Sequence, residues 1–132
     1  MAESAPKQWP AWPVPADLTA KSFNEASIAL FDLFRASASN GEAIIRGRTF
    51  RNCRLEGPAV AVIAGGCSFD AVDFGYASGD IRNLVIRSAN PGKLIGGIPF
   101  QDCVFENCMF FAVGFAGPEP FLQQLLALRT PQ

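Results

Sequence analysis

Large apolar residues recur every five positions in two stretches of this chain. The clearest run is Phe100, Phe105, Phe110 and Phe115. A second run is Ile45, Phe50, Leu55 and Val60. An α-helix repeats its apolar positions about every 3.6 residues and a flat strand about every two, so neither keeps this spacing on one buried surface. Short strands joined by tight corners do, because each side of such a coil turns the same one residue in five inward.

Every cysteine stands two residues before a large apolar side chain. The pairs are Cys53 and Leu55, Cys67 and Phe69, Cys103 and Phe105, and Cys108 and Phe110. Residues two apart in an extended segment point to the same face, so each thiol is predicted to face inward beside its neighbour. We therefore expect four buried, reduced cysteines.

Together, the five-residue spacing and the small residue two places earlier resemble the pentapeptide-repeat proteins, over about residues 45–115. The resemblance implies an all-β fold, a right-handed β-helix of stacked coils. We place the coils at about 42–116. A looser β-helix with larger coils fits the same pattern.

Each end of this coil region carries a helix signal. Ser22 and Glu25 form a capping box, and the apolar stripe behind it predicts an amphipathic helix over about 22–37. Pro120 suits the first turn of a short helix over about 119–129. These helices are expected to cap the two ends of a single domain spanning residues 16–132.

Residues 1–15 are rich in proline and are predicted to form an extended arm. Trp9 and Trp12 either pack across the protein's own apolar surface or dock on a partner or a second copy. Phe111 directly follows an inward phenylalanine and should point outward. With Leu122 and Leu126 on the last helix, it is a candidate for an interface.

Composition narrows the possible chemistry. Lys and Arg total 11 and Asp and Glu total 12 in the 132 residues, giving a net charge of −1. This balance argues against neutralising phosphates and against imitating a nucleic-acid backbone. The chain has no histidine, so it lacks the commonest general base and transition-metal ligand. The closest cysteines, Cys103 and Cys108, do not have zinc-site spacing. We expect no metal, no cofactor, no nucleophilic cysteine and no enzyme.

Two groups of charged residues are candidate sites. Arg46, Arg48, Arg51 and Arg54 form a basic cluster that predicts a solvated face or, less simply, contact with an anion or nucleic acid. Arg48 is anomalous because it falls at an inward position. It is expected to mark a corner, to extend past the coil toward water, or to pair with a buried carboxylate. Asp70 and Asp73 should lie outside as solubilising carboxylates.

The pattern favours a non-catalytic scaffold or protein-interaction module that self-associates or binds another protein. From the family resemblance comes an alternative, a regulator of a DNA-handling enzyme such as a topoisomerase. A third candidate is a small enzyme or carbohydrate binder with a pocket lined by Asp70, Asp73 or Arg48. Neither an apolar signal segment nor a membrane-length apolar run is seen, so a cytoplasmic location is expected.

Overall fold

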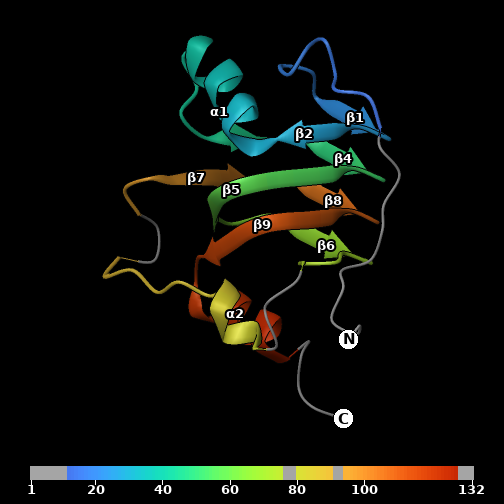
Figure 1. Ribbon diagram of the computed structural model, residues 1–132. Helices are drawn as coiled ribbons and strands as arrows, with labels where there is room; N and C mark the ends of the chain where they lie inside the picture. The colour runs from blue at the N-terminus through green and yellow to red at the C-terminus, as the bar shows by residue number, and fades with distance from the viewer. Residues whose placement is uncertain (1–11, 76–79, 91–93, 128–132) are drawn as a thin grey trace.

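The computed structural model describes residues 12–75, 80–90 and 94–127 (Figure 1). Its strands are β1 Ser22–Asn24, β2 Ser27–Ala29, β3 Ile45–Arg46, β4 Thr49–Arg51, β5 Arg54–Ile63, β6 Ser68–Asp70, β7 Gly97–Gln101, β8 Val104–Glu106 and β9 Met109–Ala116. Its helices are α1 Leu30–Ser39, the 3-10 helix η2 Ile81–Leu84, and α2 Glu119–Ala127.

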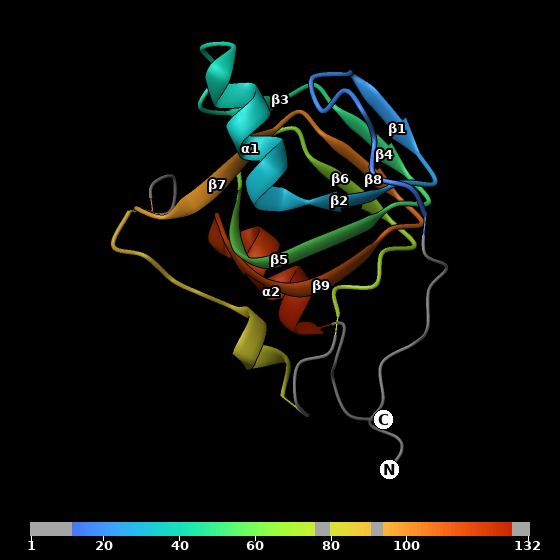
Figure 2. The same ribbon diagram turned by 45° about the horizontal axis from the view of Figure 1, so that its top comes forward.

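The described strands pair in parallel and form two sheets (Figure 2). One sheet has the order β1-β4-β8-β6, and the other has the order β2-β5-β7-β3 with β9 also paired to β5. The prediction of an all-β, right-handed β-helix is therefore wrong. The fold is a mixed α/β arrangement of two parallel sheets and two α-helices, without a closed solenoid.

The error lies in which strands neighbour each other. Strand β8 lies between β4 and β6, with Phe105 in register with both Phe50 and Phe69. Strand β7 likewise lies between β3 and the end of β5. Residues 97–116 are thus inserted between two passes of residues 45–70. A coil built in chain order would have placed consecutive passes side by side.

The inward direction of the five-residue pattern is confirmed. Phe100, Phe105, Phe110 and Phe115 are at most 1% exposed, and Ile45, Phe50 and Leu55 are fully buried. Val60 is the exception, since it is half-buried. The pairing of β5 with β9 shifts register between Glu56 and Ala59, and this irregularity puts Ala61 and Ile63 in the core instead.

Phenylalanine rings join the rungs of the first sheet. The rings of Phe23, Phe50, Phe105 and Phe69 stack nearly parallel, with successive centroids 5.4, 5.1 and 5.0 Å apart. In-register parallel pairing makes this possible, because it puts equivalent side chains directly above one another. The stack runs from β1 through β4 and β8 to β6.

One corner is shared by successive rungs of the first sheet. Glu25, Asn52, Ala71 and Asn107 follow the four strands, with φ of 52°, 54°, 53° and 52°. Asparagine tolerates this left-handed region better than most residues. The Asn107 amide donates to the Asn52 side-chain oxygen at 2.6 Å, and the Asn52 amide donates to Asn24 at 3.0 Å. The corner therefore carries its own ladder of hydrogen bonds.

The predicted helix over 22–37 begins too early. Residues 22–29 form β1 and β2, and α1 starts at Leu30 with Ala29 as an N-cap that makes no side-chain hydrogen bond. Phe23 and Ile28 are themselves five residues apart and pair with Phe50 and Leu55. Burial in the stack outweighed the local capping signal. Helix α1 lies at the β2 end of the sheets (Figure 1).

At the opposite end, α2 covers Glu119–Ala127, in agreement with the predicted helix from about 119. Its Leu122 and Leu125 are 1% exposed and point into the core. Within the described part of the chain, no helix has the length and apolarity needed to cross a membrane.

Candidate functional site

A cavity of about 290 Å³ lies between the last rung of the first sheet and α2. Strand β6 and the segment after it supply one side, and α2 supplies the other. The lining residues are Phe69, Ala71, Val72, Phe74, Phe121, Gln124 and Leu125. We call this site the aromatic cup.

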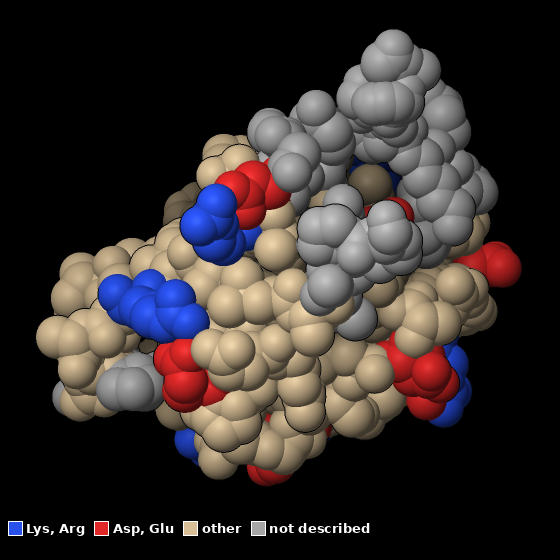
Figure 3. Space-filling view, turned by 90° about the horizontal axis from the view of Figure 1, so that it is seen from below, with Lys and Arg blue, Asp and Glu red and all other residues tan. Residues whose placement is uncertain are grey.

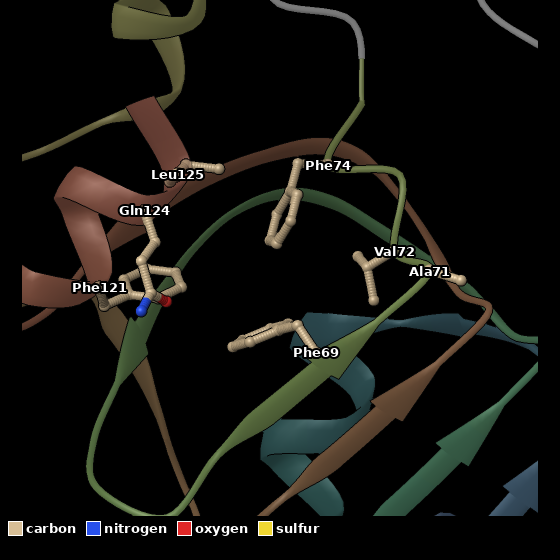
Figure 4. A pocket seen from close by; sticks show the side chains of 7 residues that line it. All are labelled: Phe69, Ala71, Val72, Phe74, Phe121, Gln124 and Leu125. Carbon is tan, nitrogen blue, oxygen red and sulfur yellow. The ribbon is translucent and has the colours of Figure 1, made fainter. Parts of the chain in front are cut away.

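Three rings shape the aromatic cup (Figure 4). Phe69 forms its floor, and the centroids of Phe74 and Phe121 lie 5.5 and 5.4 Å from that of Phe69. Phe69 and Phe74 also stack on Phe105 and Phe110, at 5.0 and 5.9 Å. The walls are therefore held by the buried core, so the cup is formed before any ligand arrives.

The chemistry of the lining is apolar with one hydrogen-bonding group. Among the described residues, Gln124 is the only polar side chain in the lining, and no charged side chain of that part of the chain contributes to it. An amide both donates and accepts a hydrogen bond. A small apolar group therefore fits this site better than an ion, because an ion would lose its water without gaining a partner charge.

A second hollow, of about 400 Å³, adjoins the cup and shares Phe69, Phe121 and Gln124 with it. Cys67 lines this hollow and is half-buried, so the prediction of four buried thiols holds for the other three only. A hydrogen bond with the Cys103 thiol lowers the pKa of Cys67 to about 7. No other titratable side chain from the described part of the chain lines the two hollows.

The structure does not bring the predicted interface residues together. Trp9 lies outside the described residues, and Trp12 is half-buried. Phe111 is 40% exposed, but the guanidinium of Arg54 lies 5.4 Å from its ring centroid. Leu122 is buried in the protein's own core and Leu126 is half-buried. Phe111 is therefore the most exposed of the predicted interface residues that the structure describes.

The basic cluster is divided among separate partners. Arg51 pairs with Glu106 at 2.8 Å and Arg54 with Glu56 at 3.0 Å. The Nε of Arg46 donates to the side-chain oxygen of Gln101 at 3.2 Å. Arg48 is buried, so no continuous basic face forms from these four side chains.

The carboxylates of Asp70 and Asp73 do not line either hollow. Asp73 accepts a hydrogen bond from the backbone of Gly75 at 2.9 Å, which stabilises the turn after it. In the view from below, uncharged atoms make up most of the visible described surface, and acidic and basic groups stand beside each other (Figure 3). That face carries no continuous stripe of one charge.

Within the described residues, no group of three metal-ligating side chains is assembled. No family model, curated protein or solved structure matches this chain. The resemblance to pentapeptide-repeat proteins thus rests only on the five-residue spacing and the small residue two places earlier.

Sequence reasoning missed the aromatic cup. Phe69 and Phe74 lie five residues apart, which predicts burial but not a pocket, and the residues predicted for an interface on the last helix were Leu122 and Leu126, not Phe121. A usable signal was present, because Phe121, Gln124 and Leu125 lie at i, i+3 and i+4 and so share one face of α2. The partner of that face was not visible from the sequence, since β6 and α2 are far apart in the chain.

Proposed function

We propose that this protein is a binding module that takes an apolar side chain of a protein partner into the aromatic cup. The observation that carries the proposal is the cup itself, with three core-supported rings and one amide. Aromatic pockets with few polar groups are typical anchor sites at protein interfaces. The partner is a second copy of this chain or another protein.

A cytoplasmic location belongs to the same proposal. All four cysteines are free thiols, as expected in a reducing compartment. The topoisomerase alternative drew its support from a β-helix that this chain does not form, and we do not carry it forward.

Small mimics of side chains test the cup directly. Toluene and indole represent Phe and Trp, and butylamine represents Lys. Toluene and indole are expected to shift the NMR signals of Val72, Phe69 and Leu125, whereas butylamine should leave them unchanged. Replacing Gln124 with Trp fills the cup, and we expect at least a tenfold loss of affinity, about 1.4 kcal/mol.

Ala38→Trp is the control, because Ala38 is exposed on α1, at the other end of the sheets, and does not line the cup. Equal binding by both variants would reject the cup as the site. Light scattering then identifies the kind of partner. If a second copy fills the cup, the native mass falls to that of a monomer in Gln124→Trp and is unchanged in Ala38→Trp.

A further inference from the structure

The four cysteines form two cross-strand pairs that the chain order does not suggest. For Cys67 and Cys103, the Asp102 amide donates to the Gly65 carbonyl at 3.0 Å and the Ser68 amide donates to the Cys103 carbonyl at 2.9 Å. These bonds flank the two cysteines and place them opposite each other. Neighbouring strands lie about 4.8 Å apart, which falls within the usual Cα separation of a disulfide, about 4.4–6.8 Å, but exceeds its usual Cβ separation, about 3.5–4.5 Å. The two side chains must therefore approach each other as the bond forms.

Cys53 and Cys108 repeat this arrangement one corner further along. The Asn52 amide donates to the Glu106 carbonyl at 3.0 Å, and the Met109 amide donates to the Cys53 carbonyl at 3.0 Å. Each pair thus joins a residue of the 45–70 stretch to a residue of the inserted 97–116 stretch. The two pairs share this hydrogen-bond pattern, with the donor and acceptor roles of the two stretches exchanged.

The two cysteine pairs differ in how deeply they are buried. Cys53, Cys103 and Cys108 are fully buried. Cys67 is half-buried and lines the hollow of about 400 Å³ beside α2. A small reagent in that hollow would lie against Cys67, whereas Cys53 and Cys108 are fully enclosed by the protein.

The contact between the thiols also makes Cys67 the stronger nucleophile of its pair. The interaction between the two thiols lowers the pKa of Cys67 and raises that of Cys103. The carboxylate of Asp102 acts against this effect on Cys67. The Cys103 thiol donates to the Ile45 carbonyl at 3.4 Å, and the Cys67 thiol donates to the Phe100 carbonyl at 3.5 Å. Cys103 thus remains protonated beside the reactive sulfur.

We propose that Cys67 and Cys103 are a dithiol that a small hydroperoxide oxidises to a disulfide, whereas Cys53 and Cys108 stay reduced. The Cys67 sulfur attacks the terminal peroxide oxygen, which breaks the O–O bond, forms a sulfenic acid and releases the corresponding alcohol, or water when the oxidant is hydrogen peroxide. The Cys103 sulfur then attacks the Cys67 sulfur, which forms the S–S bond, and the Cys103 proton leaves with the sulfenic hydroxyl group as water. The two thiols lose two electrons and the peroxide gains them.

The experiment treats the native full-length protein with hydrogen peroxide and maps the products by mass spectrometry. The expected result is one disulfide joining the peptides that carry Cys67 and Cys103, with free thiols falling from the four of the sequence to two. A reductant should restore all four. A link between Cys53 and Cys108, or thiol loss that requires denaturant, would overturn the proposal.

Variants assign the two roles separately. Cys67→Ser should give neither disulfide nor sulfenic acid. Cys103→Ala should halt at a Cys67 sulfenic acid, which dimedone traps. Cys108→Ala is the matched control and should form the Cys67–Cys103 disulfide at the wild-type rate. Circular dichroism would show whether a variant fails to react because it is misfolded. The disulfide map of the wild-type protein tests the proposal even if no variant folds.

Discussion

Arg48 shows how one residue departs from the pattern around it. It occupies an inward position and is 5% exposed. No carboxylate among the described residues forms an ion pair with it; its Nη1 donates to the carbonyls of Leu18 and Ala20 at 3.2 and 3.3 Å. Residues 18 and 20 precede β1, so the guanidinium ties the chain entry to the first sheet. Among the described residues, Arg48 therefore bonds to backbone carbonyls and does not form the buried ion pair that was one of its predicted roles.

Replacing Arg48 with Ala should lower the free energy of unfolding by about 2–3 kcal/mol, because two carbonyls lose a charged donor and a cavity is left. Arg48→Met should cost less, since methionine fills part of the space without a buried charge. Urea denaturation measures both. The control is Arg46→Ala at an exposed position, expected within about 0.5 kcal/mol of wild type. Equal losses for Arg48→Ala and Arg46→Ala would contradict the assigned role.

Helix α2 shows what an element contributes. Its first turn is tied to the segment before β7, because the Arg87 guanidinium donates two hydrogen bonds to Glu119, at 3.0 and 2.7 Å. Gln123 donates to the same carboxylate at 2.6 Å. The bonds from Arg87, with a smaller effect from Gln123, lower the pKa of Glu119 to about 2. The helix that closes the aromatic cup is thus anchored by a pH-sensitive contact.

This contact predicts a pH dependence of stability. Glu119 has a lower pKa in the folded chain than in the unfolded chain, where Glu titrates near 4.3. Its contribution is therefore present above that pH and is lost as the pH falls through about 2. The thermal midpoints of wild type and Glu119→Gln should differ by about 1–3 °C at pH 6, a small difference because the ion pair is exposed. The two midpoints should converge near pH 2, where Glu119 becomes protonated.

Arg87→Gln is the second arm of this experiment. It removes the guanidinium, so it should reproduce the loss seen in Glu119→Gln, and the double variant should add little. A difference between wild type and Glu119→Gln that stayed constant from pH 6 to pH 2 would show that the ion pair does not stabilise the helix.

At the scale of the whole molecule, the insertion of residues 97–116 decides the folding behaviour. Strand β6 pairs only with β8 among the described strands, and β4 has β8 as one of its two neighbours. Strand β5 lies beside both β7 and β9. The first half of the chain therefore cannot complete its sheets alone, in contrast to a coil whose successive turns stack on each other.

A fragment of residues 1–90 is accordingly expected to be unfolded, with no cooperative transition in circular dichroism or calorimetry. Adding a peptide of residues 91–132 should restore the sheets, because it supplies β7, β8, β9 and α2 together. The intact chain is the reference. A fragment 1–90 that unfolded cooperatively by itself would show that the 45–70 stretch pairs with itself, contrary to the observed order.

By itself, the sequence determined which side chains are buried over most of the sheet region. Phe50, Phe105 and Phe110 are buried and follow the five-residue spacing, because each short strand and corner turns the same position of the repeat toward the core. It also determined the closing helix, since Pro120 and the leucines after it are a local signal. These are properties of neighbouring residues.

Only the tertiary structure decided which strands pair. The apolar spacing is the same in the 45–70 and 97–116 stretches, so it does not show whether Phe69 or Phe105 lies next to Phe50. In the structure the neighbour of Phe50 is Phe105, and Phe69 lies on the other side of Phe105. The aromatic cup and the Cys67–Cys103 contact both depend on that choice. They join residues distant in the chain, and the free energy that selects their pairing comes from packing of the whole core rather than from any local pattern.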